Sequence, residues 1–198
     1  MKKQINITEL VCTRISHDLI GNIGAFANAV ELLEDGDEDF MPEIQSMLKN
    51  SSSVLNARMK FFRMTFGLTN ANLEHPEIVQ KTCIDYIKTL NPNHPVELKM
   101  NPIANQAALN RALMLAVMVA ADVIVKGGMV TIQADSKKIT AYAQSNFPLS
   151  QTKIEGIKSV LNGELPEGLP QYAPLFCLRE MGGTLELNTD NGFVLSIG

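Results

Sequence analysis

Apolar residues recur every three or four positions along the first third of the chain, in two runs. In residues 7–34 the run comprises Val11, Ile15, Leu19, Ile23, Phe26, Val30 and Leu33. In residues 40–66 it comprises Ile44, Met47, Leu48, Leu55, Met59, Phe62 and Phe66, with the small residue Ser51 on the same stripe. This spacing is typical of an amphipathic helix with one apolar face. Because only a short acidic link separates the two runs, we expect an antiparallel helical hairpin.

The pattern changes at residues 68–76, LTNANLEHP, where Asn, Thr and Pro interrupt the periodicity. Beyond this segment helical and strand patterns alternate. Helices are predicted near 77–90, 105–125, 151–161 and 173–181, and strands near 96–100, 129–134, 139–144, 184–189 and 193–197. The predicted fold class is therefore α+β, with a helical hairpin domain (1–67), a linker (68–76) and an α/β sandwich (77–198).

Composition and charge exclude several classes of protein. The chain has 198 residues, of which 45% are apolar, enough for one ordinary domain or two small ones. Its net charge is −4 and its 17 basic residues are scattered, so no nucleic-acid partner is expected. The three cysteines stand far apart, which is typical of reduced thiols in a cytosolic protein. No signal peptide is evident, and the most apolar stretch, 113–125, is too short to span a bilayer and contains Asp122. We expect a cytoplasmic protein without a membrane partner.

One histidine stands apart from the apolar pattern. On a helical projection of residues 7–34, His17 lies roughly 180° from the centre of the apolar stripe, so we expect it to face away from the hairpin core. The outer face near His17 also carries Arg14, Gly21, Gly24 and Asn28. A mid-helix glycine lowers helix stability by about 1 kcal/mol relative to alanine. One reason for two such glycines is that they leave space for a helix or loop of another protein to approach closely. A histidine that is merely solvated would show the same periodicity.

The hairpin has an apolar face on each helix and cannot bury both well by itself. Pairing with a second copy would close four helices into a bundle, which predicts a homodimer. Packing of the hairpin on the C-terminal domain of its own chain is the alternative.

Three segments resemble proteins of two-component signalling. Residues 14–25, RISHDLIGNIGA, resemble the phosphoacceptor box of histidine kinases and, more closely, that of the ChpT-type histidine phosphotransferases, which keep a glycine-rich stretch after the histidine. Residues 58–67, RMKFFRMTFG, are similar to the end of the second bundle helix in that family. Residues 109–128 are similar to its apolar helix, which ends in a Gly-Gly pair. The resemblance implies a four-helix bundle formed on dimerisation, followed by a degenerate histidine-kinase ATP-binding domain.

The resemblance further implies a role in a phosphorelay. His17 would carry a phosphoryl group between receiver domains of response regulators, including that of a hybrid histidine kinase, and Asp18 would hydrogen-bond the imidazole. The residues implied in receiver docking are Arg14, Ile20, Gly21, Asn22 and Gly24. The receiver domain would supply the Mg²⁺, so neither a metal site nor a cofactor is expected in this chain.

The departures from the kinases concern the nucleotide. Val119 stands where the kinases carry a Mg²⁺-binding Asn. Residues 142–149 (YAQSNFPL) lack the Asp and Gly of the adenine site, and residues 169–175 (LPQYAPL) lack the glycine-rich phosphate loop. A triphosphate would find no partner there, so we expect neither ATP binding nor autokinase activity. Asn22 replaces the usual Pro, and Gly21 stands where kinases with phosphatase activity tend to carry Thr or Asn, which argues against phosphatase action.

Two other functions compete with phosphotransfer. A degenerate kinase of this kind could dock response regulators as a non-catalytic interaction module, and His17 would then never be phosphorylated. An ATP-dependent autokinase is opposed by the missing nucleotide motifs.

Overall fold

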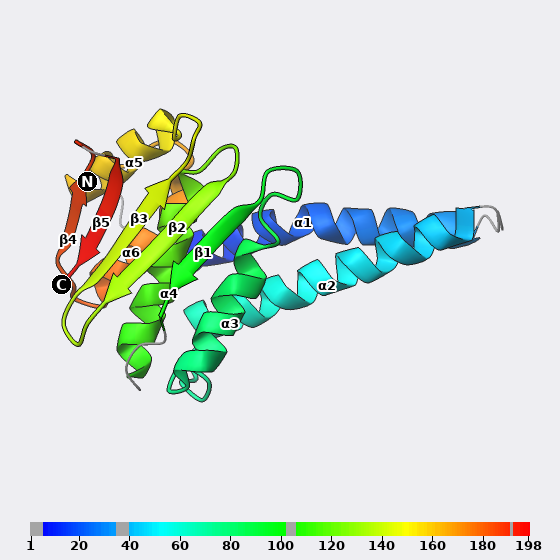
Figure 1. The fold of residues 1–198 in the computed structure, drawn as a ribbon, viewed down its shortest axis with the longest axis horizontal. Coiled ribbons are helices and arrows are strands. Elements are labelled where there is room, and N and C mark those ends of the chain that lie inside the picture. The colour runs from blue at the N-terminus through cyan, green and yellow to red at the C-terminus, as the bar shows by residue number, and fades with distance from the viewer. Residues whose placement is uncertain (1–5, 35–39, 102–105, 191) are drawn as a thin grey trace.

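The computed structural model describes residues 6–34, 40–101, 106–190 and 192–198. Its first two elements, α1 (Ile7–Glu34) and α2 (Met41–Phe66), are the predicted long helices. They form an antiparallel hairpin whose far end projects away from the rest of the molecule (Figure 1). Asn6 caps α1, because its Oδ1 accepts hydrogen bonds from the backbone N–H groups of Thr8 and Glu9. Residues 35–39 of the predicted acidic link lie outside the described residues.

The C-terminal part of the chain contains a five-stranded sheet with helices packed on it. Its strands are β1 (Val96–Met100), β2 (Gly128–Ala134), β3 (Ile139–Gln144), β4 (Leu185–Asn188) and β5 (Phe193–Ile197), in the order β1-β2-β3-β5-β4. β1 and β2 are parallel, and the crossover between them is helix α4 (Ala107–Asp122). The other pairs are antiparallel. Residues 112–121 of α4 are all buried, and α4 lies behind the sheet in Figure 1 together with α5 (Gln151–Leu161) and α6 (Ala173–Glu180).

The predicted α+β class is confirmed, and the differences lie mostly at the ends of elements. The helix expected at 77–90 is α3 (Pro76–Ile87), and the one expected at 105–125 ends at Asp122. Gly127 and Gly128 then take positive φ angles of 58° and 151°, which glycine adopts at little cost as the chain turns into β2. A 3₁₀ helix, η2 (Leu169–Tyr172), has no counterpart among the predicted elements because so short a turn carries no apolar period.

The apolar stripe of α1 lies in two different environments. Its first half packs on the core of the sheet domain through Val11, Ile15 and Leu19. Its second half is open in the single chain, where Ile23 is 49% exposed and Phe26 38%. The base of the hairpin therefore packs on its own C-terminal domain, while an apolar strip remains uncovered farther out. None of the helices in the described ranges is long and apolar enough to cross a membrane.

Candidate functional site

His17 lies on the solvent-facing side of α1, in the half of the helix that packs on the C-terminal domain. Its side chain is 82% exposed, which confirms the predicted orientation. Its neighbours one turn along the same face are Ile20, 65% exposed, and Gly21, and Gly24 follows at the next turn. A Cβ added to Gly21 or Gly24 would meet no atom within 4 Å, so this face is open beside the histidine. Asn22 is half-buried and lies off this face.

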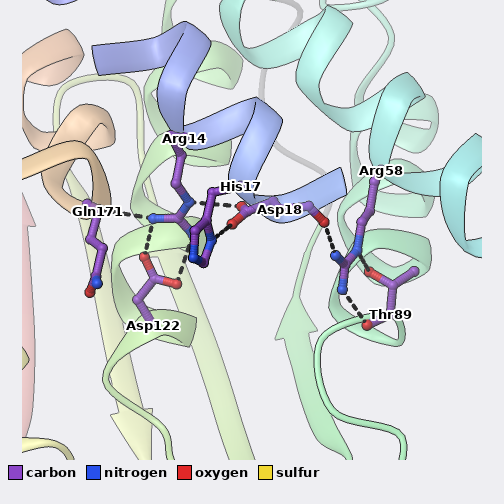
Figure 2. Close-up of polar contacts among 7 residues, drawn as sticks. All are labelled: Arg14, His17, Asp18, Arg58, Thr89, Asp122 and Gln171. Atoms are coloured by element: carbon purple, nitrogen blue, oxygen red, sulfur yellow. Dashed lines mark hydrogen bonds and ion pairs between the residues drawn. The ribbon is translucent and has the colours of Figure 1, made fainter. Parts of the chain in front are cut away.

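Asp18 connects His17 to the buried part of the site (Figure 2). Its Oδ1 lies 3.7 Å from Nδ1 of His17, an ion-pair distance that is too long for a hydrogen bond. Its other oxygen, Oδ2, accepts a hydrogen bond of 2.7 Å from Nε of Arg14. The Asp18 side chain is only 17% exposed, so the two oxygens of one largely buried carboxylate face a buried cation and an exposed imidazole.

Arg14 does not lie on the outer face, and this part of the sequence-based prediction is wrong. The residue is 6% exposed. Its Nη1 and Nη2 donate to the two carboxylate oxygens of Asp122, at 2.7 and 2.9 Å, and Nη1 also donates to the backbone oxygen of Gln171 at 2.9 Å. A projection of one helix could not detect that α4 and η2 cover this side of α1. Arg14 is thus unavailable for receiver docking.

The ion pair keeps Arg14 charged. Burial by itself lowers the pKa of a guanidinium, but the charge of Asp122 and its hydrogen bonds outweigh that effect and raise the pKa of Arg14 well above its ordinary value. The bidentate geometry is the strongest arrangement available to an arginine and a carboxylate. It joins the hairpin to the C-terminal domain directly beneath His17.

Arg58, from α2, holds the same turn of α1 from the other side. Its Nη1 donates to the backbone oxygen of Asp18, while its Nε and Nη2 donate to Oγ1 and the backbone oxygen of Thr89 at 3.0 and 2.8 Å. Thr89 follows α3, whose Tyr86 stacks on Phe61 of α2 with ring centroids 3.9 Å apart. The turn that bears His17 is therefore tied to α2, α3, α4 and η2.

An open groove separates His17 from the C-terminal domain. One wall is α1, with Thr13 and His17, and the other walls come from α4, α5 and η2, including Asp122 and Lys153. Lys153 is half-buried and supplies a positive charge on the wall that faces α1. In the described part of the chain, no cluster of three His, Cys, Asp or Glu residues is placed to hold a metal ion.

The sequence patterns point to none of Asp122, Gln171 and Thr89 as part of this site. Gln171 and Thr89 accept hydrogen bonds through backbone oxygens, so side-chain identity carries little signal there. Asp122 does give a weak signal in the sequence, since it is the single charged residue between positions 112 and 125. A charge in such a helix needs a partner, but the sequence does not say which.

Comparisons with known proteins find similarity in sequence and in fold. No protein-family model matches the chain. Over 65 residues it is 45% identical to the protein phosphotransferase ChpT of Brucella abortus (strain 2308), a match that covers 32% of this chain and 29% of that protein. A solved structure of a bacterial phosphotransferase superposes with a TM-score of 0.73 over 98% of both chains, at 20% identity. The chain thus resembles a ChpT-type phosphotransferase in sequence over about a third of its length and shares the fold of a bacterial phosphotransferase throughout.

Proposed function

We propose that this chain is a histidine phosphotransferase in which His17 relays a phosphoryl group between response-regulator receiver domains. The observation that carries the proposal is an exposed imidazole whose Nδ1 faces a carboxylate, on a helical turn that is anchored from two sides. The sequence match to a phosphotransferase of Brucella abortus and the shared fold support the same chemistry.

The ring nitrogen that attacks is Nε2. We assign the proton of the neutral imidazole to Nδ1, because the negative charge of Asp18 on that side attracts an N–H, and this leaves a lone pair on Nε2. Nε2 attacks the phosphorus of the receiver's aspartyl phosphate; the N–P bond forms as the P–O bond breaks, and the aspartate leaves as a carboxylate. The phosphoimidazole then carries a positive charge, which the carboxylate of Asp18 stabilises. Transfer to a second receiver is the reverse reaction.

The receiver would supply the Mg²⁺ and most of the stabilisation of phosphoryl charge. Docking would use the open face of Ile20, Gly21 and Gly24, where a partner helix can approach α1 closely.

The C-terminal domain would act without nucleotide. Val119 and Tyr172 line a cavity of about 10 Å³, room for about one water molecule. Tyr172 fills the space over α5, because a Cβ added to Gly156 would lie 1.9 Å from its hydroxyl. This packing leaves no room for a phosphate group beside Val119, which supports the expectation that ATP does not bind at that position. A calorimetric titration with saturable Mg–ATP binding would contradict it.

The functional unit would be a homodimer. The outer half of the α1 stripe, with Ile23 and Phe26, and Met47 on α2, 39% exposed, form an uncovered apolar strip. Pairing two such hairpins would bury it in a four-helix bundle. This agrees with the dimer expected from the sequence.

The test is to incubate the protein with a phosphorylated receiver domain and to measure acid-labile label on it. The His17→Ala variant should lose the label, and His94→Ala is the matched control, since His94 is exposed in a loop and contributes to none of the contacts above. Label on His17→Ala would show that another residue carries the phosphate. A wild-type protein that binds the receiver but is never labelled would instead support the non-catalytic interaction module.

A further inference from the structure

A continuous chain of charged groups runs from the end of α4 to His17. Asp122 binds both Nη atoms of Arg14, Arg14 binds Oδ2 of Asp18 through Nε, and Oδ1 of Asp18 faces the imidazole (Figure 2). We propose that Asp122 is a positioning residue for phosphotransfer: by balancing the charge of Arg14, it keeps Oδ1 of Asp18 turned to Nδ1 of His17. The inference rests on the proposed function for its effect on rate, but its effect on the imidazole can be measured without any transfer.

The donor inventory of Arg14 gives the reason. A guanidinium has five N–H donors, one on Nε and two on each Nη. Asp122 and the Gln171 backbone oxygen take three of the four Nη donors, and Asp18 is bound through Nε alone. One Nη2 donor therefore remains on the Nε/Nη2 edge even with Asp122 in place, so Asp122 does not block that edge. Its effect on Asp18 comes from its charge, which neutralises the guanidinium from the other side. Without that charge Asp18 can bind the Nε/Nη2 edge with both oxygens, the arrangement that a carboxylate prefers, and Oδ1 then no longer faces His17.

The charge balance leads to the same conclusion. Arg14 is almost completely buried and lies between two carboxylates whose side chains are 17% and 19% exposed. If Asp122 loses its charge, Asp18 is left as the only anion in contact with the guanidinium and is drawn more strongly toward it. The other charged groups near this point are Lys153, across the groove, and Arg58, which binds the backbone of Asp18 rather than its carboxylate. Neither can hold Oδ1 toward the imidazole.

The consequence for His17 is a change of tautomer. A carboxylate facing Nδ1 favours the proton on Nδ1, and its withdrawal lets the exposed ring return to the mixture found in water, in which Nε2–H predominates. An Nε2 that carries the proton cannot attack phosphorus. Transfer should therefore slow even though His17 and the docking face are intact.

The decisive variant is Asp122→Asn, which keeps the shape but removes the charge and one acceptor. Its matched control is Asp85→Asn, which removes the carboxylate of an exposed Lys81–Asp85 pair on α3 in the same way. Two measurements are made: the imidazole ¹⁵N shifts of His17 by NMR on the unphosphorylated protein, and the single-turnover rate of transfer as a function of receiver concentration.

For Asp122→Asn we expect a shift of the His17 tautomer toward Nε2–H and a fall of about tenfold in the limiting transfer rate. The receiver concentration for half-saturation should stay unchanged. Asp122→Glu restores the carboxylate and should recover most of both signals, and Asp85→Asn should alter neither. Should Asp122→Asn fail to fold, Arg14→Lys serves instead, because an ammonium cannot bridge both carboxylates in fork geometry.

An unchanged tautomer in a folded Asp122→Asn protein overturns the inference, as does a loss of receiver affinity at an unchanged limiting rate. If the tautomer shifts as expected but the wild-type protein accepts no phosphate, the positioning role stands and the proposed function fails. The two failures are therefore distinguishable.

Discussion

Replacing Arg14 by methionine would remove the cation between two carboxylates while keeping much of the side-chain volume. Four hydrogen bonds of 2.7–2.9 Å would be lost, and Asp18 and Asp122 would face each other with side chains less than a fifth exposed. Removing one partner from a buried ionic cluster costs about 3–5 kcal/mol, because the remaining charges stay buried and unpaired. For a chain of this length, 1 kcal/mol corresponds to about 2–4 °C in Tm. We expect the variant to melt about 6–20 °C lower at neutral pH.

Thermal and urea unfolding of the variant and the wild type, followed by circular dichroism at neutral pH, measures this loss of stability.

The matched control is Lys81→Met, which removes the cation of an exposed pair with side chains 70% and 37% exposed. Such pairs contribute about 0–1 kcal/mol, so the control should melt close to the wild type. A cost below about 1 kcal/mol for Arg14→Met would refute the reasoning. The ion pairs of the Arg14 guanidinium would then not be what stabilises the contact between the hairpin and the C-terminal domain.

Three further predictions concern docking, assembly and the thiols. Gly21→Ala should stabilise α1 by up to about 1 kcal/mol and leave receiver binding intact, because a Cβ meets open space there. Gly21→Leu should weaken receiver binding in a titration. Equal affinity of the two variants for the receiver would contradict close contact between the receiver and this face of α1. Wild-type protein should scatter light as twice 21.7 kDa at micromolar concentration, and Phe26→Glu, which places a charge in the uncovered strip, should lower that mass; a monomeric wild type would rule out the bundle. Burial raises the pKa of Cys177 to about 11, so its alkylation rate should rise about tenfold per pH unit between pH 7 and 10. Burial raises the pKa of Cys83 still further, and mass spectrometry should find Cys83 modified only under conditions that unfold the protein.

Most of the fold could be predicted because periodicity is a local property. Alternation with a period of 3.6 or 2 records which side of an element meets the core, whatever the partner is. For that reason the long helices, the strands and the outward orientation of His17 could be read from the chain. The ends of α3 and α4 and the short η2 could not, since caps and single turns are set by a few contacts that leave no repeat.

The periodicity of the chain is enough to establish that α1 is amphipathic, that His17 faces outward with Gly21 and Gly24 beside it, and that the C-terminal part is an α+β domain. The burial of Arg14 could be seen in the folded molecule alone, because its partner Asp122 stands 108 residues away on an otherwise apolar helix. A helical projection places a charged residue on the solvent side by default, because it contains no information on which other domain covers that side of the helix. Long-range pairing of charges depends on topology, and topology brings Asp122, Arg14 and Asp18 into one line that ends at His17.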